Sequence, residues 1–421
     1  MKNTLRWSTM AFAIALAAWP APAASVQAAK PEDVGFSNER LQRIHETIQR
    51  HIAAGDISGA VTLVARRGRI AHFEAHGLMD IDAKKAMQKD ALFRIASMSK
   101  PITGTAILML MEEGKIRLTD PVSKFIPEFK GMKVAVVREG AAGGRGAAGG
   151  RGAAEPQFYT VPSDREITIR DLLSHVSGLV SGPISTAEAN KLGRKPTDAL
   201  ADYIPRLGAT PLEFQPGSRW SYSPSAGFDT LGRIVEIVSG EPFDRFLRER
   251  IFGPLEMKDT TFYATDNQLA RVATRYQKTA NGLTKQEGGA PSQVYFSGAG
   301  GLSSTAEDYA QFGQMLLNGG QLNGKRLLGP KTVELMASVH APDTLPGRAP
   351  GRSFGLSVQV VNNAVAASYR VSDGSFGWDG AFGTHFWIDP KEKVVGILMV
   401  QTSSQEIMRD FENAVMQAMV E

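Results

Sequence analysis

Two groups of short β-strand patterns, one near each end of the chain, place the strongest constraint on its fold. Residues 59–65 and 69–75 flank Arg67-Gly68, which predicts a β-hairpin. Further strand-like stretches, spaced by glycine, asparagine and Asp-Pro turns, lie at 353–361, 366–372, 382–388 and 393–401. The middle of the chain has mostly helical patterns. We therefore expect an α+β fold in which both ends build one antiparallel sheet and helices cover it.

The same distribution predicts how the chain is divided into domains. Residues 30–97 and 296–421 would form the domain that holds the sheet, and residues 98–295 would form an inserted, mostly α-helical domain. A functional site is expected in the cleft between them. Terminal helices over 37–53 and from about Gln405 to Val420 would flank the sheet. Within residues 140–156, Gly-Ala-Ala-Gly-Gly-Arg repeats every six residues and offers little to bury, which predicts a flexible insertion.

The first 29 residues have the composition of an export signal. Lys2 and Arg6 precede an apolar run of ten residues from Met10 to Trp19, which is too short to span a bilayer. Small-x-small cleavage positions follow at Ala21-Pro22-Ala23 and Val26-Gln27-Ala28. No later stretch has the roughly 18 successive apolar residues of a spanning helix. We predict a signal peptide and a periplasmic or secreted protein with no membrane span in its mature form.

Charge and cysteine content argue against several kinds of partner and site. The chain has 47 basic and 43 acidic side chains, a balance that favours neither nucleic acid nor an anionic membrane as a partner. Because there is no cysteine, disulfides, thiolate catalysis and cysteine-ligated zinc are excluded. The sequence His45-Glu46-Thr47-Ile48-Gln49 lacks the second histidine of the H-E-x-x-H zinc motif. We predict no metal site and no cofactor.

Ser97 and Lys100 form an S-x-x-K sequence at the start of a predicted helix. Proline is tolerated only in a first helical turn, so Pro101 requires the helix to begin close to Ser97, which we expect to cap it. Residues three apart share a helix face, which would bring the Lys100 amine near the Ser97 hydroxyl. Free N–H groups at the helix start could hold an oxyanion. Since a chain of this length contains about one S-x-x-K by chance, the tetrapeptide alone is better explained by a capping serine and a solvated lysine.

Four sequence blocks, taken together and in order, resemble the serine β-lactamase and penicillin-binding-protein superfamily. They are FRIASMSK at 93–100, LLSHVSGL at 172–179, FQPGSRWSYS at 214–223 and GGLSST at 300–305. The chain is most similar to the class C-like branch that includes family VIII carboxylesterases. The resemblance runs from about Gly35 to the C-terminus and is interrupted by the 140–156 insertion. It implies an exported serine hydrolase that works through an acyl-enzyme.

The resemblance also implies roles for individual residues. Ser97 would be the acylated nucleophile, and Lys100 and Tyr222 would share the work of general base on Ser97 and later on the deacylating water. The oxyanion hole would consist of the backbone N–H groups of Ser97 and Ala381. His175, in the second block, has no acid partner nearby in the sequence, so we expect it to fix a loop rather than to act as a base.

Two departures from the family pattern bear on the substrate. The Tyr-x-Asn motif reads Tyr222-Ser223-Pro224, so the amide that contacts a β-lactam side chain is missing. The Lys-Thr-Gly motif is absent, and Trp378-Asp379-Gly380 takes its place as the expected substrate-binding segment. Trp378 either lines the acyl pocket or only packs on its strand, and Asp379 would repel acidic substrates. These changes favour neutral short-chain esters over penicillins, with weak or no β-lactam hydrolysis.

Two alternatives to a carboxylesterase remain open at this point. The same residues would serve a class C-like β-lactamase or a D-amino-acid peptidase. A catalytically silent, penicillin-binding-like protein that only binds its ligand is the second alternative. No Gly-x-Ser-x-Gly elbow occurs, which argues against an α/β-hydrolase. The expected partner is a small ester or β-lactam-like molecule, and no oligomeric state is predicted.

Overall fold

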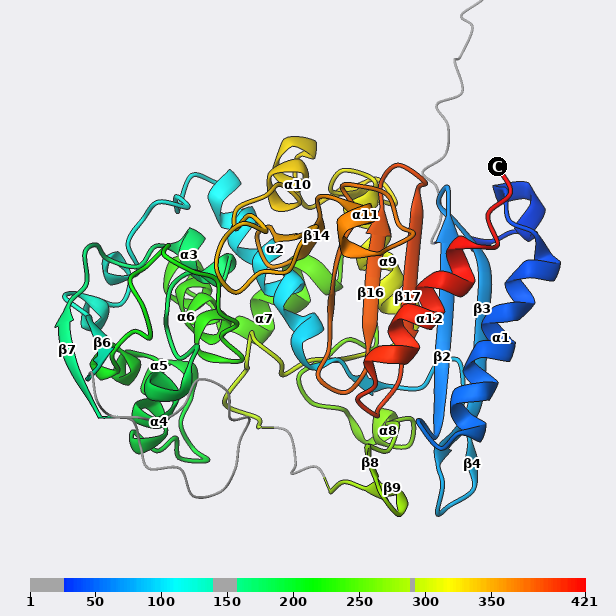
Figure 1. Cartoon of the computed structure of the whole chain (residues 1–421), viewed down its shortest axis with the longest axis horizontal. Helices are drawn as coiled ribbons and strands as arrows, with labels where there is room; N and C mark the ends of the chain where they lie inside the picture. Colours follow the sequence, from blue (N-terminus) through cyan, green and yellow to red (C-terminus); the bar gives the residue numbers. More distant parts are fainter. Residues whose placement is uncertain (1–25, 139–156, 288–291) are drawn as a thin grey trace, which may run out of the picture.

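One nine-stranded sheet is built from strands that come from both ends of the chain (Figure 1). The computed structural model describes residues 26–138, 157–287 and 292–421. Across the sheet the strands are β1 (Gln27–Ala28), β3 (Arg69–Asp80), β2 (Gly59–Arg66), β17 (Val394–Met399), β16 (His385–Asp389), β15 (Phe376–Asp379), β14 (Gln359–Val361) and β13 (Arg352–Phe354), with β4 (Lys85–Ala86) beside β3. All pairs are antiparallel except β1 with β3. The pairing of β2 with β17 joins the two ends of the chain, which confirms the predicted sheet.

The predicted strand at 366–372 is wrong. That segment begins with the short helix α11 (Ala364–Ala367), and the strand next to β16 is β15 instead. Asn363 starts the helix, because its side-chain oxygen accepts the N–H of Ala366 at 2.9 Å. Asp373 accepts the N–H of Ala364 at 2.6 Å and holds the same turn closed. These local hydrogen bonds outweigh the β-propensity of the segment.

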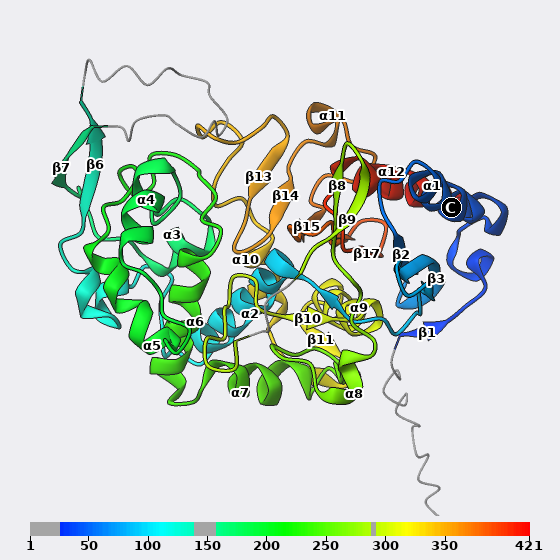
Figure 2. The same ribbon diagram turned by 90° about the horizontal axis from the view of Figure 1, so that it is seen from below.

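Helices cover both faces of the sheet (Figure 2). The terminal helices α1 (Asn38–Ala53) and α12 (Gln405–Met416) pack on one face, where Ile44, Ile48 and Phe411 are buried with Val64 of β2. The helix α12 ends at Met416 and is shorter than the predicted helix, which extended to Val420. On the other face lie α9 (Ala306–Leu317) and α2 (Ser99–Glu112). Residues 99–110 of α2 are all buried, because the helix lies between the sheet and the helical region.

Between β5 (Phe93–Arg94) and β10 (Ser303–Ser304), helices make up most of the regular secondary structure, as expected, and in the described parts of the chain four two-stranded sheets lie outside the main one. The small sheets pair β5 (Phe93–Arg94) with β10 (Ser303–Ser304), β6 (Lys133–Val137) with β7 (Phe158–Pro162), β8 (Tyr276–Thr279) with β9 (Gly282–Lys285), and β11 (Gln321–Leu322) with β12 (Lys325–Arg326). The other α-helices are α3 (Ile169–Leu173), α4 (Pro183–Lys191), α5 (Leu200–Tyr203), α6 (Ala226–Ser239), α7 (Phe243–Leu247), α8 (Asp266–Leu269) and α10 (Pro330–Met336). Single turns occur at η1 (Pro31–Val34), η2 (Ala96–Met98), η3 (Val122–Lys124), η4 (Pro127–Phe129), η5 (Pro205–Ala209) and η6 (Arg248–Phe252).

Two sequence predictions fall largely outside the described residues. Most of the predicted signal segment precedes Val26, and the 140–156 insertion lies in the second gap. Gln27 and Ala28 pair with β3, so cleavage after Ala23 would keep β1 and cleavage after Ala28 would remove it. Among the described helices, none combines the length and the apolar character needed to cross a bilayer.

Candidate active site

Ser97 lies in the short turn η2 that links β5 to α2. The preceding residue, Ala96, has a φ of 43°, a left-handed conformation that is strained for a residue with a side chain. The helix α2 starts at Ser99, and Pro101 occupies its first turn as predicted. The prediction that Ser97 caps this helix is wrong, since Met98 is the N-cap residue and no side chain caps the helix. The turn instead aims the Ser97 hydroxyl at two other side chains.

Lys100 and Tyr222 both reach the Ser97 hydroxyl. The Tyr222 hydroxyl donates a hydrogen bond to Ser97 Oγ at 2.6 Å, although the two residues are 125 positions apart in the chain. Lys100 Nζ lies 3.2 Å from the same oxygen. The structure thus brings together the three residues that the sequence comparison selected as nucleophile and bases.

The Lys100 amine is fully buried and has three partners. It donates to the carbonyl oxygens of Pro224 and Ala299, both at 2.8 Å, and Ser97 Oγ is the third. Burial lowers the pKa of Lys100 to about 7, although the nearby Asp229 carboxylate opposes the shift. A neutral amine has two N–H groups and one lone pair. Because the two carbonyl oxygens can only accept, the lone pair of neutral Lys100 points to the Ser97 hydroxyl.

Asp229, on α6, is a site residue that the sequence prediction missed. This buried carboxylate accepts hydrogen bonds from the Tyr295 hydroxyl at 2.8 Å, the Ser297 hydroxyl at 2.7 Å and the Ala299 N–H at 3.0 Å. It therefore holds Ala299 in place through its N–H, and the carbonyl oxygen of the same residue accepts a hydrogen bond from the Lys100 amine. Burial raises the pKa of Asp229, and its three hydrogen bonds oppose the rise. The signal available in the sequence was an acidic residue beside Phe228, on the apolar side of a predicted helix, seven positions after Tyr222.

His175 fixes the segment that carries Tyr222. Its carbonyl oxygen accepts the Ser221 N–H at 3.0 Å, and its Nδ1 accepts the Ser223 N–H at 3.2 Å. The rings of His175 and Tyr222 are in contact, with centroids 4.7 Å apart. Burial, aided by the charge of Lys100, lowers the pKa of His175 well below its usual value. His175 is thus a neutral residue that fixes a loop, as predicted.

Burial also sets the protonation of Tyr222. It raises the pKa of the phenol, and the hydrogen bond with Ser97 only partly opposes this rise. Tyr222 is therefore a hydrogen-bond donor at neutral pH, while Lys100 is the group that titrates there.

The segment Trp378-Asp379-Gly380 ends β15 beside the turn that carries Ser97. The Trp378 ring packs near Tyr222, with centroids 5.6 Å apart, and contacts Phe354 edge-on at 5.0 Å. A methyl group on Gly380 would lie 2.4 Å from the carbonyl oxygen of Ile95, which shows how closely the strand approaches this turn. Within the described parts of the chain, the N–H of Ala381 makes no hydrogen bond.

The Asp379 carboxylate is partly neutralised by an ion pair. Asp379 lies 2.5 Å from His385 Nδ1, and Glu412 lies 3.0 Å from the opposite nitrogen of that ring. Burial disfavours protonation of His385, but the two carboxylates outweigh it and raise the pKa of His385 to about 10. The positive charge of the His385 imidazolium balances one of the two negative charges of Asp379 and Glu412. Repulsion of acidic substrates is therefore weaker than the sequence alone suggests.

Replacing Gly380 by alanine is expected to separate β15 from the Ser97 turn. The added methyl group would meet backbone at 2.4 Å and the Thr384 hydroxyl at 2.0 Å, so the strand must shift. We expect a loss of about 1–3 kcal/mol in the free energy of unfolding and lower hydrolytic activity. Thermal melting and ester turnover measure the two effects. The control is Gly232→Ala in α6, where the methyl group meets its nearest atoms at 3.4 Å; equal stability of the two variants would contradict this assignment.

Comparison with known proteins identifies the family of this chain. Residues 44–417 match the family described as Beta-lactamase. Protein Rv1367c of Mycobacterium tuberculosis is 38% identical over 368 residues, which cover 83% of this chain and 86% of that protein. Esterase EstB of Burkholderia gladioli is 29% identical over 378 residues, covering 83% and 87%. The solved structure of EstCE1, described as a hydrolase with promiscuous acyltransferase activity, superimposes with a TM-score of 0.75 at 27% identity and covers 90% of this chain and 99% of that one. The chain belongs to the β-lactamase family of serine hydrolases.

Proposed function

We propose that this protein is a carboxylesterase that cleaves short-chain neutral esters through an acyl-enzyme on Ser97. The observation that carries the proposal is the set of partners around the Lys100 amine. Two carbonyl oxygens occupy its N–H groups, and the remaining position faces Ser97 Oγ at 3.2 Å. With a pKa of about 7, this amine is neutral in a large fraction of molecules at neutral pH.

Acylation begins with transfer of the Ser97 proton to Lys100. As the proton moves to the Nζ lone pair, Ser97 Oγ attacks the ester carbonyl carbon and the carbonyl oxygen becomes an oxyanion. The N–H groups of Ser97 and Ala381 are the proposed donors to that oxyanion. The Tyr222 hydroxyl, 2.6 Å from Ser97 Oγ, stabilises the attacking oxygen and then passes a proton to the leaving alkoxide. Lys100 supplies that proton in turn and becomes neutral again.

Deacylation uses the same groups in the reverse direction. A water molecule takes the place of the departed alcohol and gives its proton to Lys100 through Tyr222. The resulting hydroxide attacks the acyl carbon, the bond to Ser97 Oγ breaks, and that oxygen recovers its proton. The carboxylic acid leaves, and the starting state is restored.

The departures at Pro224 and Trp378-Asp379-Gly380 support esters over β-lactams. Pro224 has no side-chain amide to offer and contributes only its carbonyl, which holds Lys100. No lysine occupies the Trp378-Asp379-Gly380 segment, so the cation expected for a substrate carboxylate is missing there. Trp378 beside Tyr222 would form an apolar wall for a short acyl chain. The similarity to EstB and EstCE1 supports the same choice.

Competition between an ester and a cephalosporin tests the proposed function. Initial rates with p-nitrophenyl butyrate and with a chromogenic cephalosporin give kcat/KM for each substrate, together with a panel of longer acyl chains. We expect the butyrate to be preferred by at least about a hundredfold. Faster turnover of the cephalosporin would identify a β-lactamase instead. Absence of turnover and of a covalent fluorophosphonate adduct would identify a protein that only binds its ligand.

Asp229→Asn is expected to move the pH profile of hydrolysis toward acid. The Asp229 charge raises the pKa of Lys100, so its removal should lower that pKa further. Since the active form has neutral Lys100, the rise of kcat/KM with pH should occur at lower pH in the variant. Asparagine keeps an oxygen for the Ala299 N–H, which limits the loss of structure. An unchanged or more basic inflection would show that this carboxylate does not act on Lys100.

We also propose that the protein is exported, with residues 1–29 removed in whole or in part. The basic start, the apolar run of ten residues and the two cleavage positions support this proposal. Expression of the full chain, cell fractionation and mass measurement of the mature N-terminus test it. A full-length chain retained in the cytoplasm would contradict it.

A further inference from the structure

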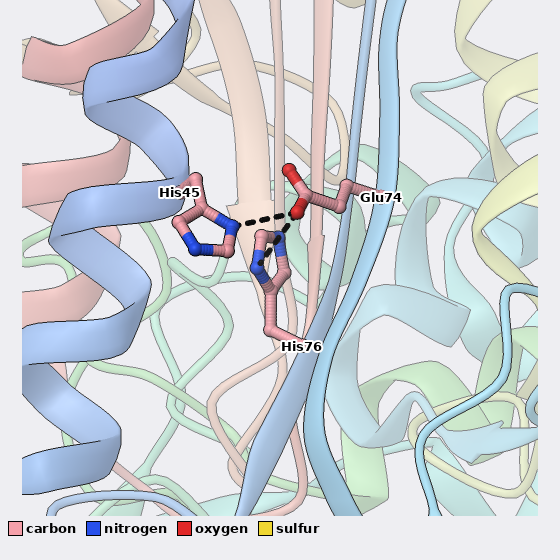
Figure 3. A group of neighbouring side chains, drawn as sticks. All are labelled: His45, Glu74 and His76. Atoms are coloured by element: carbon pink, nitrogen blue, oxygen red, sulfur yellow. Dashed lines mark hydrogen bonds and ion pairs between the residues drawn. The ribbon is translucent and has the colours of Figure 1, made fainter.

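Three side chains far from the Ser97 turn converge between α1 and the edge of the sheet. His45 lies on α1, and Glu74 and His76 lie on β3, where residues two apart share a face (Figure 3). His45 Nδ1 is 2.6 Å from Glu74 Oε1, and His76 Nδ1 is 3.7 Å from the same oxygen. The candidate ligand atoms all lie within 4.8 Å of one another. This group, the His45–Glu74–His76 cluster, is on the opposite face of the sheet from α2.

One nitrogen in the cluster is buried and has no partner. The His76 side chain is fully inaccessible, and its Nδ1 makes no hydrogen bond within the described chain. Leaving such an atom unsatisfied is costly, because water cannot replace the missing bond. Its 3.7 Å separation from Glu74 is too long for a hydrogen bond.

The other nitrogen of His76 is held by Thr62. His76 Nε2 is 2.9 Å from the Thr62 hydroxyl, which also lies 2.8 Å from His72 Nε2. A histidine that donates its Nε2–H to Thr62 presents a bare lone pair at Nδ1, facing the Glu74 carboxylate. Two electron-pair donors that face each other in this way are stabilised by a cation between them. Histidines that bind metals are commonly oriented by such a hydrogen bond from the second ring nitrogen.

We propose that the His45–Glu74–His76 cluster binds a divalent transition-metal ion of the Zn²⁺ class. Two imidazole nitrogens and one carboxylate are ligands that Zn²⁺ favours. Bonds of about 2.1 Å in a tetrahedral site place ligand atoms about 3.4 Å apart, a value that the 2.6 and 3.7 Å separations bracket. Side-chain exposures of 43% for His45 and 35% for Glu74 leave a path for the ion and room for water as fourth ligand.

A neighbouring histidine on the same helix shows what distinguishes the cluster. Both ring nitrogens of His51 lie within hydrogen-bond reach of separate carboxylates, Asp56 at 2.7 Å and Asp410 at 3.1 Å. Both nitrogens of that ring therefore have a hydrogen-bond partner, and neither is left over for a metal. In the His45–Glu74–His76 cluster, both histidines face the same oxygen of Glu74. Only His45 is within hydrogen-bond distance of it, and Nδ1 of His76 has no partner.

The expected consequence is a cross-link between α1 and the sheet. A bound ion joins the first helix to β3, and ligands that bind only the folded state raise its stability by mass action. Because the cluster lies on the other face of the sheet from α2, the metal is not part of the ester chemistry. The inference is therefore independent of the proposed function.

Zinc titration of the tag-free, full chain tests the proposal. After treatment with EDTA and buffer exchange, ZnCl₂ is added in a calorimeter and the melting temperature is measured with and without Zn²⁺. We expect one Zn²⁺ per chain, a higher melting temperature with zinc, and no displacement by excess Mg²⁺. His45→Ala and Glu74→Gln should each weaken binding at least tenfold and remove the zinc-dependent rise in melting temperature. Both residues are partly exposed, so these variants should fold.

His340→Ala is the matched control, because His340 is half-buried and its Nε2 bonds only the Leu335 carbonyl. It should bind zinc like the wild type. Absence of one-to-one binding in the wild type, or equal affinity in wild type, His45→Ala and Glu74→Gln, would overturn the proposal. Retained binding in His45→Ala with loss in His340→Ala would overturn it as well.

Discussion

Replacing Ser97 by alanine is expected to lower kcat/KM for p-nitrophenyl butyrate by at least about a thousandfold. The variant lacks the oxygen that receives the hydrogen bond from Tyr222 and faces Lys100, so no acyl-enzyme can form. A thousandfold loss corresponds to about 4 kcal/mol of transition-state stabilisation. Steady-state kinetics measure the loss, and labelling with a fluorophosphonate followed by mass spectrometry should give an adduct in the wild type alone.

Ser123→Ala provides the control for the Ser97 variant. The Ser123 hydroxyl donates to the Glu166 carboxylate at 2.8 Å, in η3 and away from the Lys100 amine. Its removal should leave both turnover and labelling unchanged. Ester hydrolysis within tenfold of the wild type in Ser97→Ala would place the nucleophile elsewhere.

The sheet could be predicted because its strands carry local signals. The hairpin of β2 and β3 follows from two strand patterns around Arg67-Gly68, and the position of β16 and β17 follows from the apolar stretches after residue 381. The pairing of strands from the two ends of the chain was inferred from the expectation that both ends build one sheet. The error at 366–372 shows the limit, because Asn363 and Asp373 close a turn there through side-chain hydrogen bonds that propensity does not describe.

The candidate site was predicted only where a motif marks it. Ser97, Lys100 and Tyr222 stand in blocks that resemble a known superfamily, and the fold brings them together. Asp229 lies outside these blocks, and the carbonyl groups of Pro224 and Ala299 cannot be recognised in a sequence, because any residue can supply a backbone carbonyl. The role of Ser97 as a helix cap was predicted from residue preference, but its hydroxyl is directed to Lys100 and Tyr222.

The prediction that no metal site exists rested on short motifs. The possible ligands His45 and Glu74 are 29 positions apart, and a spacing pattern cannot detect a pair that forms only when α1 packs on β3. The unsatisfied nitrogen of His76 is likewise a property of the folded chain. The two carbonyl groups that bind Lys100 and the His45–Glu74–His76 cluster both form only in the folded chain, so the sequence alone does not predict them.

The Lys100 amine is expected to give the rate a single ionisation near neutral pH. In the wild type, kcat/KM should rise about tenfold per pH unit below the pKa of about 7 and level off above it, because only neutral Lys100 accepts the Ser97 proton. Tyr222 does not produce this inflection, since burial raises its pKa and keeps it protonated there. Lys100→Met should remove the inflection and lower kcat/KM by at least about a thousandfold. Methionine is close to lysine in length and can occupy the same buried position, but its thioether cannot accept a proton near neutral pH.

Lys115→Met separates this effect from a general loss of positive charge. Lys115 is half-exposed and pairs with Glu113 at 2.8 Å, so its replacement should change neither the rate nor the inflection. If Lys100→Met keeps the inflection near pH 7, another group must accept the Ser97 proton. If the variant keeps its rate at high pH and loses it only near neutrality, Tyr222 ionises and acts as the base. Either result would replace the amine with a different proton acceptor while leaving Ser97 as the nucleophile, so the pH profile of this one variant decides between the two bases.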